Sequence, residues 1–337
     1  MPHATDPSEP ADRTTPVAMP HATDPSEPAD RTTPVPIPPP ATTDATGAGR
    51  PLTAGLALLA VAVAVVNLLV GTVLTGVALT GHAFGAWPSP RSLSQGLIGA
   101  AMLGTAPALF AVGRARTWQD TRTLLVPTAV VLLGLFTVSV LNAGRLYVAV
   151  GGPVLSVFFS IGWLLVLGVL CAWTVTALSW QRLTPAGPAA GRGLPLPAWS
   201  KPALAVLGSS WLGIGTGLLL RPAFWSAFVP WRTGRLDAQA LGVWALALGV
   251  GVLAALAEDD LHRTRPALLA LTGTAAAMAV VLAVRGADVD WASGPGTGLA
   301  VMTAGLLTAG TSGRLLLAAQ TRCTSAAPPA APGPLPR

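Results

Sequence analysis

The sequence predicts an all-α, polytopic membrane protein of eight helices, arranged as two parallel four-helix repeats. Of its 337 residues, 52% are hydrophobic and 10% are charged, whereas soluble domains carry about 25% charged residues. The charged residues gather in short breaks between long apolar runs. Residues from about 52 to 178 also align with residues from about 204 to 320 at a constant offset of 144, the signature of an internal repeat.

Eight uncharged runs are long enough to cross the hydrocarbon core, which takes about 20 apolar residues. They are residues 52–81, 92–113, 123–144, 146–181, 202–220, 238–257, 266–284 and 291–313. Polar and flexible residues around Arg145 predict a tight turn and a short interfacial hairpin between the third and fourth runs. We therefore expect the fourth helix to begin near Val154, after Pro153.

The remaining segments predict two tails and a linker. Residues 1–50 are Pro-rich, and their first 17 residues recur unchanged at 19–35. They hold too little apolar surface for a core, so we expect disorder. The first repeat would cover 51–180, a Pro/Gly-rich linker 181–202, the second repeat 203–320 and a disordered tail 321–337.

The basic residues predict how the chain is inserted. Residues 51–337 hold 17 Lys and Arg against 7 acidic residues, and these charges flank helices, so we expect the lipid bilayer as a partner and no nucleic acid. With the N-terminus inside, ten basic residues lie on one side and six on the other, which places both termini in the cytoplasm and the chain in the cell membrane. The outer six are Arg91, Arg145, Arg221, Arg232, Arg235 and Arg285. Four helices per repeat give both repeats one orientation, related by an axis along the membrane normal.

The loop after the first helix of each repeat is the best-matched element. It reads Trp87-x-Ser89-x-Arg91-x3-Gln95 in one copy and Trp231-x-Thr233-x-Arg235-x3-Gln239 in the other. These residues are typical of the start of a transmembrane helix, where Trp lies at the membrane interface, a hydroxyl caps the helix and Arg lies near the headgroups. The functional alternative is that Arg91 and Arg235, with Trp87 and Trp231, contact an anionic group or a headgroup on the outer surface.

An aromatic run enlarges this loop in the second copy. Phe224 and Trp225 are followed by residues 228–231, of which the first is Phe and the last Trp. A segment of this kind is typical of an interfacial anchor. An external gate is the alternative hypothesis.

The segment from Trp231 to Trp244 resembles a family signature. It contains Leu236-Asp237-Ala238-Gln239-Ala240-Leu241-Gly242-Val243-Trp244. This is similar to a Trp-Pro-x-Thr-Pro-Leu-Thr-Ala-Arg-x-Leu-Gly-x-Trp pattern in uncharacterised multi-pass bacterial integral membrane proteins. Gln239 stands where that pattern has Arg, and Arg232 where it has Pro. The resemblance covers one loop and one helix start and implies no particular activity.

An acidic cluster, Glu258-Asp259-Asp260-x-His262, ends the sixth run. Its consecutive acids fan around a helix and have no Asp-rich counterpart on the same side, so we predict no metal site. At the offset of 144, Glu258 and Asp260 correspond to Arg114 and Arg116. We therefore predict ion pairs between the repeats, which need these side chains within about 4 Å of one another.

Several absences narrow the function. No charged residue lies centrally in a predicted span, which disfavours ion-coupled carriers. Two cysteines, Cys171 and Cys323, make no disulfide framework. His82 and His262 are predicted at opposite faces, so we expect no haem pair and no cofactor.

Three functions stay open, and no catalytic residue can be named. The first is a permease-like or accessory membrane protein that handles a small apolar or amphipathic molecule, or a partner membrane protein. The second is a membrane-embedded enzyme for a lipid or isoprenoid, with Asp237, Asp288 and Asp290 as its outer acids. The third is a structural or signalling membrane protein. A permease predicts a polar cavity between the repeats.

Overall fold

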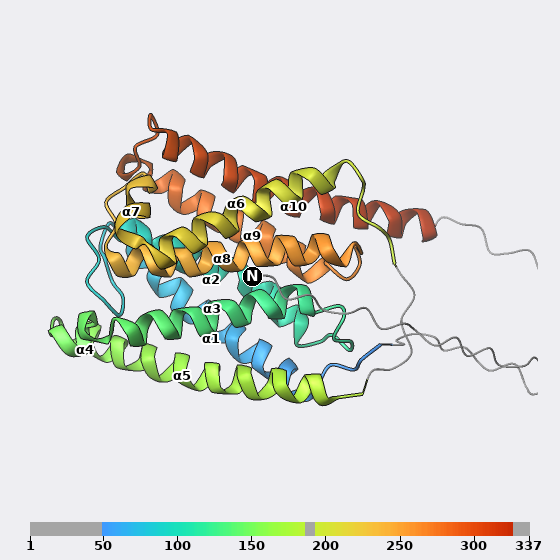
Figure 1. The fold of residues 1–337 in the computed structure, drawn as a ribbon, viewed down its shortest axis with the longest axis horizontal. Helices are drawn as coiled ribbons and strands as arrows, with labels where there is room; N and C mark the ends of the chain where they lie inside the picture. The colour runs from blue at the N-terminus through green and yellow to red at the C-terminus, as the bar shows by residue number, and fades with distance from the viewer. Residues whose placement is uncertain (1–48, 186–192, 326–337) are drawn as a thin grey trace, which may run out of the picture. The chain divides into compact units, whose positions relative to one another are not determined.

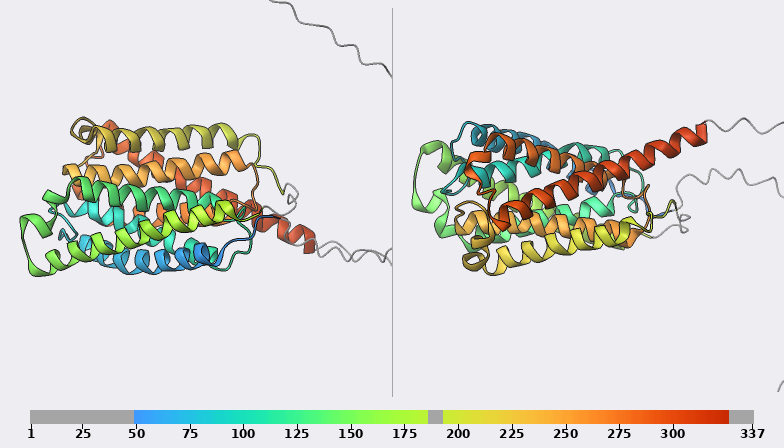
Figure 2. Two further views of the ribbon diagram at one scale, coloured as in Figure 1. Left: turned by 60° about the horizontal axis from the view of Figure 1, so that its bottom comes forward. Right: turned by 90° about the horizontal axis from the view of Figure 1, so that it is seen from above.

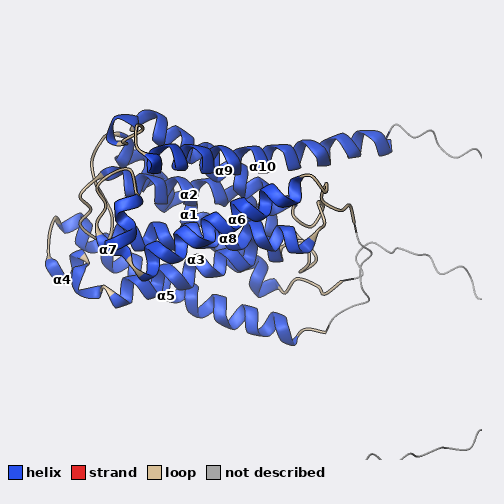
Figure 3. Cartoon of the chain, turned by 45° about the horizontal axis from the view of Figure 1, so that its top comes forward, coloured by secondary structure: helices blue, strands red, loops and turns tan. Residues whose placement is uncertain are grey.

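The computed structural model describes residues 49–185 and 193–325, and this part of the chain is helical, without a strand (Figures 1 and 3). Eight of its helices are long and apolar enough to cross a membrane. They are α1 (Ala54–Leu79), α2 (Ser92–Val112), α3 (Arg122–Leu141), α5 (Val154–Leu183), α6 (Ser200–Leu220), α8 (Arg235–Glu258), α9 (Arg265–Val284) and α10 (Gly294–Ser325). The predicted class and number of spans are confirmed.

Short helices fill the connections at one end of the bundle. They are η1 (Ala143–Arg145), α4 (Tyr147–Val150), α7 (Pro222–Trp225), η2 (Ser226–Phe228) and η3 (Gly286–Asp288). We call this the Trp87 end and the opposite one the Glu258 end. The hairpin expected before the fourth span is present as η1 and α4, and α5 begins at Val154 as predicted.

Large apolar side chains point outward along the bundle. On α5, Leu155, Phe158 and Leu165 are each more than two-thirds exposed. Soluble monomers rarely expose apolar patches of such extent, whereas lipid tails cover them at no cost. The chain is therefore an integral, multi-pass membrane protein.

The helices pack in a pattern that recurs between the two halves of the chain. Helix α1 packs along α2, and α6 packs along α8 (Figure 2). Each inner helix also meets the other half, because α2 packs on α9 and α8 packs on α3. A pseudo-two-fold axis between α2 and α8 would relate these contacts, which supports the repeat prediction; the repeat itself stays a prediction.

Glycines bring the paired helices together at matching depths. A Cβ on Gly71 would lie 2.9 Å from the Gly99 carbonyl oxygen, and one on Gly215 would lie 2.8 Å from that of Gly242. Both pairs are close-packed crossings that leave no room for a side chain. Gly213-x3-Gly217 has the spacing of such a crossing in the sequence, but Gly213 makes no contact of this kind, since no heavy atom beyond its own helix and chain neighbours lies within 4 Å of a Cβ there.

The offset between the two repeats is one residue shorter than predicted for the second and third helices of each repeat. Helix α2 begins at Ser92 and α8 at Arg235, and α3 begins at Arg122 and α9 at Arg265, an offset of 143 in both cases. The offset of 144 holds for the first helices and for Trp87 and Trp231. One residue is therefore lost between Trp231 and the start of α8.

The predicted boundaries of the tails need correction. Helix α10 continues to Ser325, past the expected start of the tail at 321, and it extends beyond its neighbours at the Glu258 end (Figures 1 and 2). Helix α5 likewise continues to Leu183, into the expected linker. Residues 1–48, 186–192 and 326–337, which carry most of the predicted tails and part of the linker, lie outside the described residues.

Candidate functional site

Two sizeable cavities lie between α6 and α10. One, of about 750 Å³, opens toward the Glu258 end beside Ser200, and we call it the Ser200 chamber. The other, of about 420 Å³, lies beneath Trp225 at the Trp87 end, and we call it the Trp225 chamber. Met302 of α10 lines both chambers. It is the one lining residue that they share among the described residues, so they are two neighbouring chambers along α6 and α10, and we call the pair the α6–α10 groove.

The groove exists because α6 and α10 lie at the periphery. Only 22% of each of their apolar stretches is buried, against 78% for α2. The two helices meet near Gly305 through the Leu207 side chain, since a Cβ on Gly305 would lie 3.0 Å from Leu207 Cδ1. Val206 and Val301 line the Ser200 chamber and are 66% and 69% exposed. The groove is therefore open sideways, toward the lipid.

The Trp225 chamber has apolar and indole walls only. Four tryptophans line it, namely Trp211, Trp225, Trp231 and Trp244, together with aliphatic residues, Phe228, prolines and glycines. No hydroxyl and no charged side chain belongs to its lining. An environment of this kind favours hydrocarbon over water.

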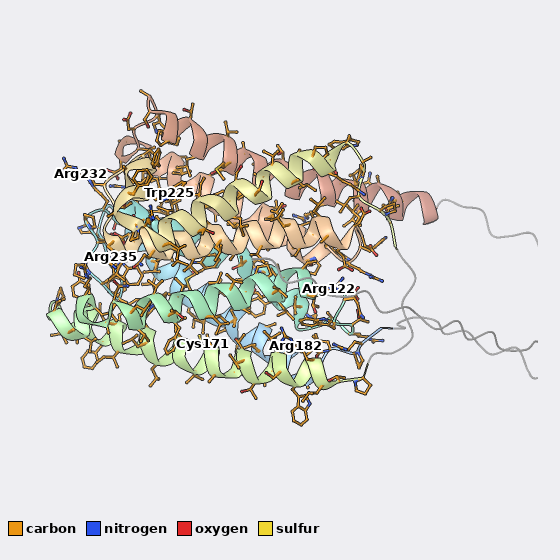
Figure 4. The ribbon with its side chains drawn as sticks, in the orientation of Figure 1. Arg122, Cys171, Arg182, Trp225, Arg232 and Arg235 are labelled. Carbon is orange, nitrogen blue, oxygen red and sulfur yellow. The ribbon has the colours of Figure 1, made fainter. Side chains whose placement is uncertain are left out.

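The aromatic segment closes the Trp225 chamber at the Trp87 end. The Trp225 ring lies directly on Gly217 of α6, where a Cβ would overlap the indole. Trp225 and Phe228 pack with ring centroids 5.6 Å apart. Figure 4 shows Trp225 at this end of the bundle, near Arg232 and Arg235. The aromatic run thus covers an apolar chamber. The sequence analysis gave an interfacial anchor for this run and an external gate as the alternative hypothesis.

The Ser200 chamber is more polar. Hydroxyl side chains from α6, from α10 and from the residue before α9 contribute to its lining, and they are Ser200, Ser210, Thr264, Thr308 and Ser312. Most donate to nearby carbonyls, as Ser200 Oγ does to Pro197 (2.8 Å) and Thr308 Oγ1 to Ala304 (2.9 Å). Their oxygens keep a free lone pair, so this chamber can accept hydrogen bonds.

Two tryptophans join the halves of the chain at the Trp87 end. Trp87 Nε1 donates to Asp237 Oδ1 (2.8 Å), and Trp231 Nε1 donates to Ser94 Oγ (2.9 Å). Ser94 and Asp237 are each the third residue of their helix, so the two bonds are reciprocal. Trp87 is 5% exposed and therefore does not reach headgroups as predicted.

Asp237 is fully engaged within the protein. Its Oδ2 accepts Ser89 Oγ (2.6 Å) and the Gly234 backbone N–H (3.3 Å), and the residue is 1% exposed. A carboxyl group at the third helical position that reaches back to the cap N–H satisfies an otherwise unpaired donor. Asp237 thus stabilises the start of α8 and its contact with the first half.

Arg91 and Arg235 differ in their surroundings, although both lie at the Trp87 end. Arg91 pairs with Asp288 across 3.6 Å, and Asp288 also pairs with Arg285. Arg235 is exposed at the start of α8, and among the described residues it has no ion pair. The predicted joint contact of the two arginines with an anion stays a prediction, and Arg91 already shares the Asp288 carboxylate with Arg285.

The acidic cluster pairs with arginines other than the predicted ones. Glu258, whose side chain is 2% exposed, pairs with Arg122 of α3 and with Arg263 at 3.0 Å. Asp260 pairs with Arg263 at 3.2 Å and accepts the Gly193 N–H. Arg114 and Arg116 are exposed and take part in no ion pair of the described structure. They follow the end of α2 in a loop, whereas Arg122, which opens α3, lies beside α8.

The outer acids do not assemble into a site. Asp237 is enclosed and Asp288 is paired, while Asp290 is exposed and joins the loops through its backbone N–H, which donates to the Pro230 carbonyl (2.9 Å). Within residues 49–185 and 193–325 no group of three His, Cys, Asp or Glu could hold a metal.

A cavity does lie between the halves, but it is small and its walls are mainly apolar. Its volume is about 60 Å³, and its walls include Asn67, Thr105 and Thr274. Asn67 Nδ2 donates to Thr105 Oγ1 (3.0 Å). The cavity has room for a few water molecules, which is too little for the solute pathway that the permease prediction requires.

Comparison with protein-family models, with curated proteins and with solved structures finds no match for this chain. The resemblance to multi-pass bacterial membrane proteins therefore stays a prediction. The sequence signal for the groove is compositional. Glycine, alanine and threonine are frequent in α10, whereas α5, the corresponding helix of the first half, is richer in Phe, Trp and Leu.

Proposed function

We propose that this membrane protein binds an apolar or amphipathic molecule of the bilayer in the α6–α10 groove, as a carrier or as an accessory protein that presents such a molecule to others. The observation that supports the proposal is the groove itself. Its two chambers have volumes of about 750 and 420 Å³, it opens sideways, and no charged side chain belongs to its lining. Ligand sites commonly have volumes of about 300–1,000 Å³ and mainly apolar walls.

The position of the groove favours a ligand that arrives through the bilayer. A water-soluble molecule would have to enter past the Trp225 cap or through the Ser200 chamber, and then lose its hydration against apolar walls. A lipid crosses between Val206 and Val301 without leaving a hydrocarbon environment. The groove therefore suits a molecule with at least one long hydrocarbon part.

The first half of the chain offers a smaller counterpart. Its corresponding groove, between α1 and α5, has about 310 Å³ and is lined by Phe159 and Trp163. If the offset of 143 between α3 and α9 continues into α5 and α10, Phe159 corresponds to Met302, which lines both chambers. A flexible thioether in place of a phenyl ring at this position is consistent with the larger space in the second half, which supports a binding role for that half in particular.

Native mass spectrometry of the full-length protein, released from its own membrane, tests the proposal. We expect a stoichiometric lipid on the wild-type protein and its loss from Gly298→Trp, which places a ring in the Trp225 chamber. A Cβ on Gly298 meets no other group within 4 Å, so the helix backbone accepts the change.

Gly213→Trp is the matched control. Gly213 lies on the exposed face of α6, outside both chambers, and a Cβ there also has open space. The proposal requires that the control retain the lipid. It is wrong if neither protein carries a defined molecule, and a stoichiometric co-purifying polypeptide in place of a lipid would indicate an accessory subunit.

A further inference from the structure

We infer that the ligand of the α6–α10 groove is a single-chain lipid with an uncharged, hydroxyl-bearing end, held with that end in the Ser200 chamber and its chain tip beneath Trp225. This inference rests on the proposed function and adds the class and direction of the ligand. It follows from the difference in chemistry between the two chambers.

The Trp225 chamber fits only the hydrocarbon part. No side-chain hydroxyl, carboxyl or amide belongs to its lining. Among its indoles, the Nε1 of Trp231 is already bound to Ser94, and the Nε1 atoms of Trp211 and Trp244 are buried without a hydrogen-bond partner in the described structure. The chamber thus offers single indole N–H donors and no side-chain acceptor, so the O–H donors of a hydroxyl-bearing end placed here would lose their hydrogen bonds to water.

The Ser200 chamber offers partners for a hydroxyl group. Its accessible hydroxyls come from α6 and from α10, since Thr264, just before α9, is 1% exposed. Ser210 is the deepest of those on α6, and its Oγ has no hydrogen bond among the described residues. Since the other oxygens mostly donate to backbone carbonyls, they are available chiefly as acceptors. A ligand end that carries O–H donors complements them.

The charges at the mouth of this chamber favour an uncharged end. Lys201, next to Ser200, pairs with Asp259 across 2.7 Å, so its charge is balanced within the protein. No charged side chain belongs to the lining itself. A phosphate or carboxylate inside the chamber would lack a cation, which is costly in a low-dielectric site.

The cap favours a flexible chain over a partner helix. Trp225, Phe228 and Trp231 cover the groove at the Trp87 end, so a transmembrane helix could not continue through it. A helix is also about 10 Å wide, whereas α6 and α10 close to side-chain contact at Leu207 and Gly305. Met302 lines both chambers, and the inference requires that a single hydrocarbon chain pass this point beside it.

Site-resolved photolabelling tests the inference. The full-length protein in phosphatidylcholine nanodiscs is incubated with two monoacylglycerols, one with a diazirine at the chain tip and one with a diazirine beside the ester. Crosslinked peptides are identified by mass spectrometry. We expect the tip probe to label residues 225–231 and the ester probe to label residues 199–210 or 308–316, with roughly a five-fold preference or more for each.

Competition and a blocking variant complete the test. Unlabelled monoacylglycerol should reduce labelling several-fold more than equimolar palmitate, and Met302→Phe should reduce it for both probes. The inference is overturned if the two probes label the same residues equally or in the reverse order, or if palmitate competes as well as monoacylglycerol. In each of these cases, saturable labelling of α6 and α10 would still support the proposed function. Absence of saturable labelling at α6 and α10 overturns both.

Discussion

The indole N–H of Trp87 in the first half of the chain donates to the buried carboxyl group of Asp237 in the second half, across 2.8 Å. The reciprocal bond, from Trp231 to Ser94, spans 2.9 Å. In each half, a tryptophan thus donates to the third residue of a helix in the other half. The two bonds differ in their acceptor, which is a carboxyl group in Asp237 and a hydroxyl group in Ser94.

This difference predicts unequal costs for two matched substitutions. Trp87→Phe should destabilise the protein by about 1.5–3 kcal/mol, because it removes a bond to a carboxylate. Trp231→Phe should cost only about 0.5–1.5 kcal/mol, because its acceptor is a neutral hydroxyl. Thermal unfolding in detergent measures both. Equal costs would indicate that Asp237 is protonated in the folded protein.

A second prediction concerns the crossing of α2 and α9. A Cβ on Gly104 would overlap the backbone N of Thr274, so Gly104→Ala must separate the two helices. We expect a fall of several degrees in melting temperature. Gly76→Ala is the control, since a Cβ there meets no other group within 4 Å and alanine favours the helix. A control variant as unstable as Gly104→Ala would contradict the explanation.

The acidic cluster gives a third prediction. Glu258→Gln should destabilise the protein by about 1–3 kcal/mol, because it weakens the links to both Arg122 and Arg263. Arg122→Met should cost less, since the Arg122 side chain is 45% exposed and solvent screens the pair. Arg114→Met should leave stability unchanged. Thermal unfolding compares the three, and a clear loss with Arg114→Met would restore the pairing predicted from the sequence.

The number and limits of the spans could be predicted because they depend on local properties. Each apolar run is bounded by charged or flexible residues, so the start of α5 at Val154 could be located to the residue. The end of α10 could not, because Arg314 and Arg322 interrupt the apolar run without ending the helix. Charge alone does not break a helix that leaves the membrane.

The partners of the charged residues could not be predicted by alignment. The offset of 144 assigns Glu258 and Arg114 to equivalent positions, whereas α2 and α8 begin at an offset of 143, and equivalent positions of a pseudo-two-fold pair touch only near the axis. The structure instead places Glu258 beside Arg122, because α8 packs on α3. The α6–α10 groove was also missed, since it depends on how far two apolar helices stand apart.

A fourth prediction concerns the cap of the Trp225 chamber. Gly217→Leu should displace the Trp225 ring, which lies directly on this glycine, and so open the chamber at the Trp87 end. If the cap retains the ligand, the variant should fold normally but lose bound lipid faster during detergent washing. Lipid content by mass spectrometry against wash time measures this. Unchanged retention with a displaced ring would show that the cap does not hold the ligand.

The last prediction tests the orientation that the basic residues indicate. In a variant with Cys171→Ala and Cys323→Ala, we expect Asp290→Cys to react in intact cells with a membrane-impermeant maleimide. His262→Cys should react only after the membrane is permeabilised. Both positions are exposed, and they lie in loops at the Trp87 end and the Glu258 end respectively. The expectation rests on a positive-inside bias of ten basic residues against six, so the opposite labelling pattern would place the Trp225 cap and both termini on the reverse sides of the membrane.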